Sequence, residues 1–281
     1  MVQAKKRHTV RKRATKRSRS SRNPFRRIPS FLLWGLLVLV VFIYVVFFYK
    51  TFVSPYSFRW KALYGSVDYP DGKVRGIDVS HYQADIDWQQ LRQAQLQGAP
   101  LSFIFVKATE GTDIIDENFN QNFYNARKNN IVRGAYHFFS TRTPARNQAR
   151  FFCKIVQLED EDLPPVLDVE HIGDLSPEKL RSEVHAWMDI VERHYGVTPI
   201  LYTSYKFKTS YLNTRDFDRY PYWIAHYYVD SLIYKGAWSF WQHTDAGRID
   251  GIRGYVDVNV FNGSYDDLVK MTLGQRKRPE D

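Results

Sequence analysis

This 281-residue chain lacks disulfides and the common metal-binding motifs. It has one cysteine, Cys153, so an intrachain disulfide is excluded, and it contains no CxxC or HExxH pattern that would indicate a metal site. Cys153 lies in an apolar helical pattern with Phe152 and Val156, which favours a buried structural thiol. We therefore expect neither a metal nor a cofactor.

Acidic residues are absent from the first 29 positions, which hold twelve Lys and Arg. The rest of the chain has 28 basic and 30 acidic residues, so the formal charge of +10 arises in the N-terminal segment. Such a run indicates either a nucleic-acid-binding arm or a topology signal that also meets anionic lipid. Because a long apolar run follows it directly, we favour the topology signal and expect no nucleic-acid partner.

Charge and proline are absent from Phe31 to Tyr49. As a helix with a rise of about 1.5 Å per residue, this run spans about 28 Å, close to the roughly 30 Å hydrocarbon core of a bilayer. It is longer than a secretory h-region of about 7–15 residues, and no small-residue cleavage site follows it. We predict a single-pass signal anchor at residues 30–50 that contacts membrane lipid, with a cytoplasmic tail at 1–29 and an extracytoplasmic body.

The rest of the chain divides into a stalk, one folded domain and a tail. Pro55, Pro70 and Gly72 are breakers that indicate a stalk at residues 51–73. Residues 74–270 alternate short apolar runs with helical patterns, which is enough chain for one sizeable core. Residues 271–281 are expected to form a solvated C-terminal tail.

Eight strand-like runs and five helical patterns predict a modified TIM-like (β/α) barrel, with helices mainly between the first five strands. The clearest helix begins after Ser176 as N-cap, has Pro177 at its first position and stops at Gly196. The expected strands are 75–79, 102–107, 132–138, 166–169, 199–202, 222–225, 237–241 and 255–260; the expected helices are 86–97, 116–128, 145–158, 176–196 and 204–213.

Asp168 and Glu170 are two residues apart in one apolar run. In a strand both side chains point to the same face, and their mutual repulsion drives their pKa values apart. One carboxyl can then stay protonated while the other is ionised, as the acid/base pair of a glycoside hydrolase requires. The alternative is a strand end that carries two structural acids, one of them bound to a nearby arginine.

Other chemistry-bearing residues also follow the expected strands. In a barrel the active site collects at the carboxyl ends of the strands, so acids and aromatics from distant segments are expected to meet there. Aromatic rims suit sugar rings, whose C–H faces are apolar. These residues are Asp78, Lys107, Tyr136, His137, Asp168, Glu170, Tyr202, Trp223, Trp241 and Asp257.

The chain resembles the glycoside hydrolase family 25 muramidases, the lysozymes of Chalaropsis type, in eight segments that occur in family order across about 74–268. The family's key acids all have counterparts here, whereas the basic tail, the anchor and the stalk lie outside the resemblance. The matching segments are RGIDVSHYQ at 75–83, FVKATEG at 105–111, GAYHFF at 134–139, PVLDVE at 165–170, ILYT at 200–203, YWIAHY at 222–227, FWQ at 240–242 and VDVN at 256–259.

This resemblance implies hydrolysis of the β-1,4 bond between N-acetylmuramic acid and N-acetylglucosamine in peptidoglycan, outside the inner membrane on the periplasmic or cell-wall side. Glu170 is expected to be the general acid and Asp168 the stabilising carboxylate, with Asp78 and Asp257 as supporting acids. Two routes stay open: attack by the substrate's 2-acetamido group, and direct attack by water. We expect a monomer; the competing hypothesis is a non-catalytic peptidoglycan-binding protein.

Six further residues are expected to line the substrate: Lys107, Tyr136, His137, Tyr202, Trp223 and Trp241. Each has a structural alternative. Lys107 can pair with an acid inside the barrel, and His137 can be a hydrogen-bonded core histidine. The aromatic residues can belong to the barrel core, although their places at strand ends favour substrate lining.

Overall fold

The computed structural model describes residues 29–53, 70, 73–229, 231–232, 234 and 236–276. The chain forms two compact units, Met1–Pro55 and Tyr56–Asp281, and each is described by itself. The expected basic tail at 1–29 lies outside the described residues except for Pro29, and so does most of the expected stalk at 51–73.

The first unit contains one long apolar helix, α1 (Ser30–Phe48), which continues as one π-helical segment, Tyr49–Val53. The stretch Ser30–Phe52 has 23 residues and a mean hydropathy of 3.0, and none of it is buried. A helix that is apolar on all sides and of this length can cross a bilayer. The predicted helix is confirmed, and an anchor and a signal sequence meet the same criterion.

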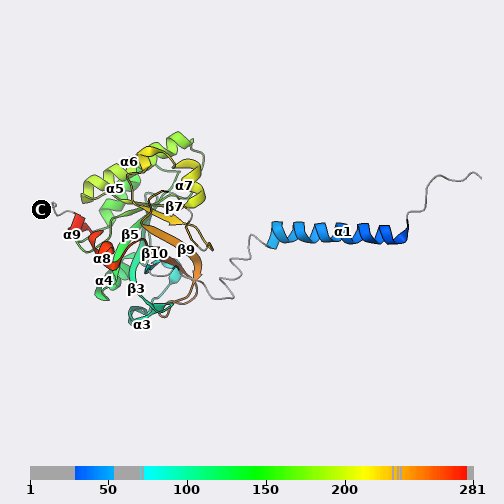
Figure 1. Ribbon diagram of the computed structural model, residues 1–281. Coiled ribbons are helices and arrows are strands. Elements are labelled where there is room, and N and C mark those ends of the chain that lie inside the picture. The colour runs from blue at the N-terminus through cyan, green and yellow to red at the C-terminus, as the bar shows by residue number, and fades with distance from the viewer. Residues whose placement is uncertain are drawn as a thin grey trace, which may run out of the picture. The chain divides into compact units, whose positions relative to one another are not determined.

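A closed barrel of eight strands forms the centre of the second unit (Figure 1). The first strand pairs with both the second and the last, which closes the sheet. Seven strands run parallel, and the last is antiparallel to both of its neighbours. The strands are β1 (Val74–Val79), β3 (Ala99–Glu110), β5 (Val132–Phe138), β6 (Val166–Asp168), β7 (Ile200–Ser204), β8 (Tyr222–Ala225), β9 (Phe240–Gly247) and β10 (Val256–Phe261).

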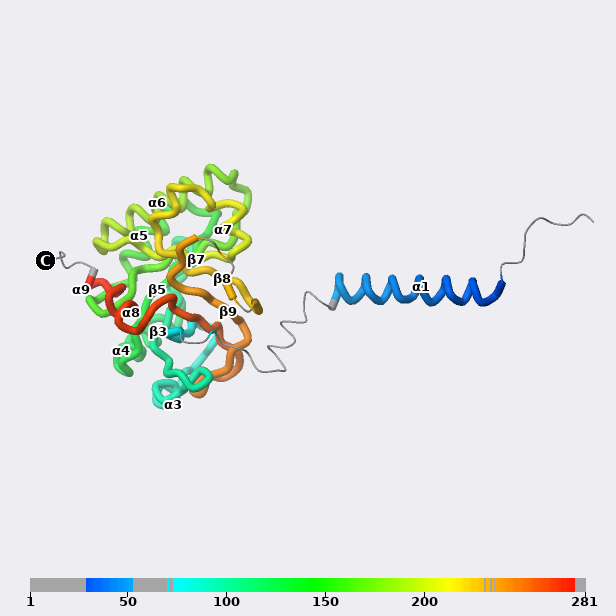
Figure 2. The backbone as a smooth tube through the Cα atoms, in the orientation of Figure 1, coloured from blue at the N-terminus to red at the C-terminus, as the bar shows by residue number. Residues whose placement is uncertain are grey.

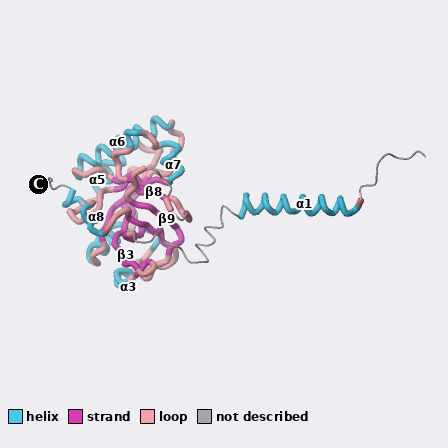
Figure 3. Tube along the Cα trace, in the orientation of Figure 1, coloured by secondary structure: helices cyan, strands magenta, loops and turns pink. Residues whose placement is uncertain are grey.

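Helices follow each of the first five barrel strands and cover the sheet from outside (Figure 3). No helix lies between β8, β9 and β10 in the described part of the chain, so the predicted modified barrel is confirmed. In α6 the Ser176 hydroxyl accepts a hydrogen bond from Lys179 N, and Gly196 ends the helix with φ 73°. The helices are α3 (Trp88–Gln93), α4 (Phe119–Lys128), α5 (Ala145–Ile155), α6 (Pro177–Tyr195) and α7 (Tyr205–Tyr211), with short 3-10 turns at His81–Gln83 and Arg215–Phe217.

Two short strands, β2 (Gln95–Leu96) and β4 (Ile114–Ile115), pair antiparallel with the two ends of β3. The sequence patterns did not predict either. The seventh barrel strand was predicted at 237–241, whereas β9 begins at Phe240 and runs to Gly247. That prediction is wrong by several residues, and the error matters for the site because it misplaces the strand end.

Aromatic rings fill the inside of the barrel. Phe103 and Phe105 of β3 pack edge-to-face against Phe240, and Phe105 stacks on Trp223 with 4.4 Å between ring centroids. A side chain in place of Gly134 on β5 would meet the Phe105 ring at 2.6 Å. The strand therefore needs glycine at this position. The aromatic side chains fill the barrel interior below the carboxyl ends of the strands.

The C-terminal segment folds onto the barrel through α8 (Tyr265–Lys270) and α9 (Leu273–Arg276), which lie near β3 and β5 in the tube trace (Figure 2). Leu273 is 1% exposed and Met271 is 5% exposed. Leu273 N and Gly274 N donate to the carbonyls of Asp162 and Asp160. The expected solvated tail at 271–281 is therefore wrong for its first residues, because 271–273 belong to the folded body.

Candidate active site

The four predicted acids meet at one end of the barrel. Asp78 is the next-to-last residue of β1, Asp168 is the last residue of β6, and Glu170 follows two residues later. Because β10 runs antiparallel, its first residues lie at the same end, and Asp257 is the ladder partner of Asp78. Each acid interacts electrostatically with at least one other member of the group.

Asp78 is fixed by two side-chain amides. Its Oδ2 accepts hydrogen bonds of 2.7 Å from Gln242 Nε2 and from Asn259 Nδ2. Burial raises the pKa of Asp78 to about 7, against the two amide bonds, which favour the charged form. A carboxyl held in this way keeps its orientation while it exchanges a proton near neutral pH.

Asp168 is the most unusual acid of the group. It is 7% exposed, and its Oδ1 has no hydrogen-bond partner among the described residues. Burial and the neighbouring Glu170 and Asp78 raise its pKa well above the ordinary value, and Lys107 opposes them. Because an unsatisfied buried acceptor is costly, this oxygen is suited to receive a group from a bound ligand.

Glu170 and Asp257 complete the cluster. Burial raises the pKa of Glu170, while His171, Tyr202 and Lys107 lower it. Burial raises the pKa of Asp257 to about 9, with a further contribution from Asp78. The cluster therefore holds protons at neutral pH, which general acid catalysis requires.

Lys107 lies inside the barrel beside these acids. Its Nζ is 2.7 Å from Glu110 Oε2 and 5.0 Å from the Phe138 ring centroid. Its side chain is 13% exposed. The alternative that Lys107 pairs with an acid is confirmed, and its positive charge faces Asp168 and Glu170 as well.

Three of the predicted aromatic residues lie inside the barrel with the acids: Tyr136, Tyr202 and Trp223. Trp223 is in contact with Tyr202 at 4.5 Å and with Tyr136 at 6.3 Å between centroids. Trp223 is 2% exposed, and its Nε1 donates to Asn259 Oδ1 at 2.7 Å. These contacts favour the structural alternative for Trp223, a residue of the barrel core.

His137 and Trp241 point away from the acids. His137 is fully buried, with one ring nitrogen 2.7 Å from Thr109 Oγ1 and the other 3.0 Å from Gln148 Oε1. Its ring stacks on Trp187 of α6, so it belongs to the layer between sheet and helices. Trp241 is 3% exposed and donates to the His226 carbonyl. The predicted substrate contact is wrong for both residues.

Sequence reasoning missed the roles of Gln242, Asn259 and Tyr227. Gln242 and Asn259 hold Asp78, and the hydroxyls of Tyr202 and Tyr227 both donate to Gln242 Oε1 at 2.7 Å. The signal was present, because Phe240 and Gln242 alternate with Trp241 along one strand. The misplaced strand assigned the wrong member of that alternation to the site.

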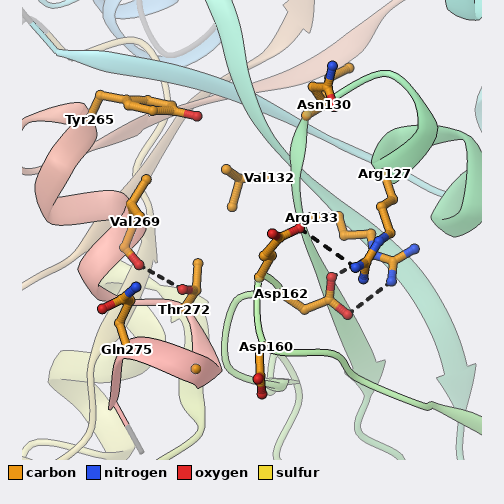
Figure 4. Close-up of a pocket in the computed structure, with 13 residues that line it drawn as sticks. Arg127, Asn130, Val132, Arg133, Asp160, Asp162, Tyr265, Val269, Thr272 and Gln275 are labelled. Atoms are coloured by element: carbon orange, nitrogen blue, oxygen red, sulfur yellow. Dashed lines mark hydrogen bonds and ion pairs between the residues drawn. The ribbon is translucent and has the colours of Figure 1, made fainter. Parts of the chain in front are cut away.

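A pocket lies at the opposite, amino end of the barrel, and two of its acids, Glu161 and Asp162, pair with arginine (Figure 4). Arg133 makes a bidentate ion pair with Asp162, with 2.6 Å between Arg133 Nε and Asp162 Oδ1, and Arg127 pairs with Glu159. Among the described residues, no group of three or more His, Cys, Asp or Glu is placed to hold a metal ion.

Comparison with known proteins gives the family. The model of Glycosyl hydrolases family 25 matches residues 77–252. The chain belongs to this family. Lysozyme M1 of Streptomyces globisporus is 33% identical to it over 217 residues, covering 70% of this chain and 71% of that protein. An uncharacterized protein of Escherichia coli strain K12, YegX, is 44% identical over 207 residues, covering 73% of this chain and 76% of YegX.

The fold agrees with this assignment. The crystal structure of a lysozyme from Streptomyces coelicolor matches with a TM-score of 0.67 at 31% identity, covering 73% of this chain and 100% of that one. The chain is therefore a glycoside hydrolase, and its family supports a peptidoglycan hydrolase activity. Asp78, Asp168 and Glu170 lie within the matched residues, and Asp257 follows them.

Proposed function

We propose that this protein is a membrane-anchored muramidase that cleaves the β-1,4 bond between N-acetylmuramic acid and N-acetylglucosamine. The observation that carries the proposal is the cluster of four acids at one barrel end, in which Asp168 Oδ1 is buried without a partner among the described residues. A structural cluster would pair such acids with arginine, as the opposite end of the barrel does.

Glu170 is the general acid in this proposal. Burial raises its pKa and so favours the protonated form over that of a free carboxyl, and it gives that proton to the glycosidic oxygen as the bond to the anomeric carbon breaks. A positioned acid of this kind contributes about 10²–10⁴-fold to the rate. The leaving N-acetylglucosamine then departs with a free hydroxyl, and Glu170 is left as a carboxylate.

Asp168 is the stabilising carboxylate. Its free Oδ1 accepts the N–H of the 2-acetamido group, which orients that group beside the anomeric carbon. Along the substrate-assisted route the acetamido oxygen attacks and Asp168 balances the positive charge of the oxazolinium ion; along the other route water attacks directly. Asp78 and Asp257 support both routes by positioning substrate and sharing a proton beside Glu170.

The barrel acts outside the cytoplasm in this proposal. The twelve basic residues before α1 stay in the cytoplasm by the positive-inside rule, and α1 is retained as the anchor in membrane lipid. The domain acts as a monomer on glycan strands within reach of the membrane. Alkaline phosphatase fused after Asp281 tests the orientation, because that reporter is active only outside the cytoplasm; an inactive, fully expressed fusion contradicts it.

The bond specificity is tested with the full chain purified in detergent and incubated with purified peptidoglycan. The products are reduced with borohydride and analysed by mass spectrometry. Fragments that end in reduced muramic acid are the expected result, and fragments that end in reduced glucosamine contradict it. Binding to peptidoglycan without any released fragment would favour the non-catalytic binding protein.

A further inference from the structure

We propose that Gln242 is a positioning residue that ties Asp78 to Tyr202 and thereby sets the direction of the Tyr202 hydroxyl beside Glu170. The inference rests on the proposed function of Glu170 as the general acid. It starts from hydrogen bonds whose directions follow from which atoms can donate and which can only accept.

Trp223 determines which atoms donate and which accept at one end of this hydrogen-bond network. An indole Nε1–H can only donate, so the Asn259 oxygen faces Trp223 and its amino group faces Asp78. Asp78 Oδ2 therefore receives N–H donors from both Asn259 and Gln242. With two donors on Oδ2, a proton bound to Asp78 must lie on Oδ1.

Gln242 is fixed by the same chemistry. Because its amino group donates to Asp78, its Oε1 faces the opposite way and accepts the hydroxyls of Tyr202 and Tyr227 at 2.7 Å each. Gln242 is 3% exposed, so water does not compete for these bonds. One buried amide thus connects a site acid to two phenols of the barrel wall.

Tyr202 is the link to Glu170. Tyr202 is the ladder partner of Asp168, and its hydroxyl lowers the pKa of Glu170, yet a phenol has a single proton to donate. Gln242 Oε1, which accepts that proton at 2.7 Å, therefore competes with the Glu170 carboxylate for it, and each bond to Gln242 leaves the protonated form of Glu170 favoured. Without Gln242, the hydroxyl is free to donate to the Glu170 carboxylate and to stabilise the ionised, inactive form.

The other charges around Glu170 stay in place when Gln242 is changed. They come from five elements of the barrel and its loops, and all except Asp78, which loses one amide donor, keep their own contacts when Gln242 is changed. They are Lys107, Asp78, Asp168, Asp257 and the adjacent His171, with the Tyr227 phenol also facing the group. A change confined to Gln242 therefore reports on the Tyr202 hydroxyl and on Asp78.

The test is the pH profile of peptidoglycan hydrolysis by Gln242→Met in the detergent-purified full chain. Methionine has a similar length but makes none of the three hydrogen bonds. We expect kcat to fall about 10-fold or more with KM little changed, and the alkaline limb to move to lower pH by about one unit. A wild-type kcat and an unmoved limb overturn the proposal.

Three further variants distinguish a positioning role from a general loss of stability. Gln148 is also fully buried and multiply hydrogen-bonded, but it lies outside the barrel against His137. Gln148→Met is expected to lower the melting temperature and leave the pH profile unchanged. In Tyr202→Phe, which lacks the hydroxyl, adding Gln242→Met should no longer move the limb, and a full additional shift contradicts the link.

Thermal unfolding distinguishes a failure of this proposal from a failure of the proposed function. The melting temperature is measured for four proteins: wild type, Gln242→Met, Tyr202→Phe and the double variant. If the wild type hydrolyses no peptidoglycan, the proposed function is wrong. The Gln242–Tyr202 coupling still predicts melting-temperature losses that are less than additive. Strictly additive losses overturn the network as well.

Discussion

The two ends of the barrel bury carboxylates in opposite ways. At the amino end, Asp162 is 1% exposed and its two oxygens are held by Arg133. At the carboxyl end, Asp168 is 7% exposed and Oδ1 has no partner among the described residues, while the nearest cation, Lys107, bonds Glu110. Burial raises the pKa of acids at both ends, but Arg133 opposes the shift at Asp162, whereas the neighbouring Glu170 and Asp78 reinforce it at Asp168.

The paired acids at the amino end stabilise the fold, whereas the clustered acids at the carboxyl end are suited to proton transfer. A buried ion pair satisfies both partners and gives no reason for either to exchange a proton. A cluster of buried acids without matching bases raises the pKa values of its members and costs stability, which is typical of functional sites. Each variant below removes one side of this contrast.

Replacing Glu170 by glutamine is expected to have the largest effect. The amide keeps the shape but cannot give up a proton, so muropeptide release falls by about 10²–10⁴-fold. The melting temperature stays close to the wild-type value, because the neutral amide has the shape of the protonated acid. Glu178→Gln, an exposed change on α6, is the control, and equal losses in both variants contradict the assignment.

Replacing Arg133 by methionine tests the amino end. It leaves the Asp162 carboxylate buried without its partner, which is expected to cost about 3–5 kcal/mol of unfolding free energy. Urea denaturation measures this cost. Arg127→Met removes a half-exposed pair and should cost about 1 kcal/mol or less; equal costs would show that burial does not decide the effect.

The pH dependence of stability tests the carboxyl end. Unfolded aspartates release their protons near 3.8, whereas Asp78 and Asp257 keep theirs to about 7 and about 9 in the folded state. These two acids bind more protons in the folded state over this range, so their contribution to stability falls as pH rises from about 4 towards 9. Asp257→Asn should flatten melting temperature against pH, and an unchanged slope contradicts the cause.

Replacing Trp241 by phenylalanine is expected to have the smallest effect on activity. The indole packs outside the barrel against Trp238 and His243, so KM should stay at the wild-type value while unfolding free energy falls by about 1 kcal/mol. Titration of initial rates against peptidoglycan concentration gives KM. A several-fold rise in KM would return Trp241 to the substrate-lining set.

The acids at the carboxyl end of the barrel were predictable from the sequence, whereas the ion pair at the amino end was not predicted. The Asp168–Glu170 spacing, the strand order and the caps of α6 follow from local periodicity and turn chemistry, and the structure brings the four acids together as expected. The residues that hold the acids were harder to predict, because partners such as Gln242 are 164 positions from Asp78.

The inward or outward direction of each aromatic was not predictable. Strands of a barrel are buried on both faces, so a tryptophan suits either side, and a one-residue slip exchanges the faces. The prediction of β9 at 237–241 placed Trp241 at a strand end, whereas its neighbour Gln242 faces Asp78. The outward direction of His137 was not predictable either, because its two hydrogen-bond partners come from two other elements, β3 and α5.

The most direct test is the initial rate of reducing-end release from peptidoglycan, expressed per folded molecule, for the wild type, Glu170→Gln and Arg133→Met. The account predicts that Glu170→Gln is folded and inactive, whereas Arg133→Met is less stable but retains the wild-type rate in its folded fraction. A Glu170→Gln protein that releases reducing ends at the wild-type rate would contradict the assignment of chemistry to the carboxyl end of the barrel.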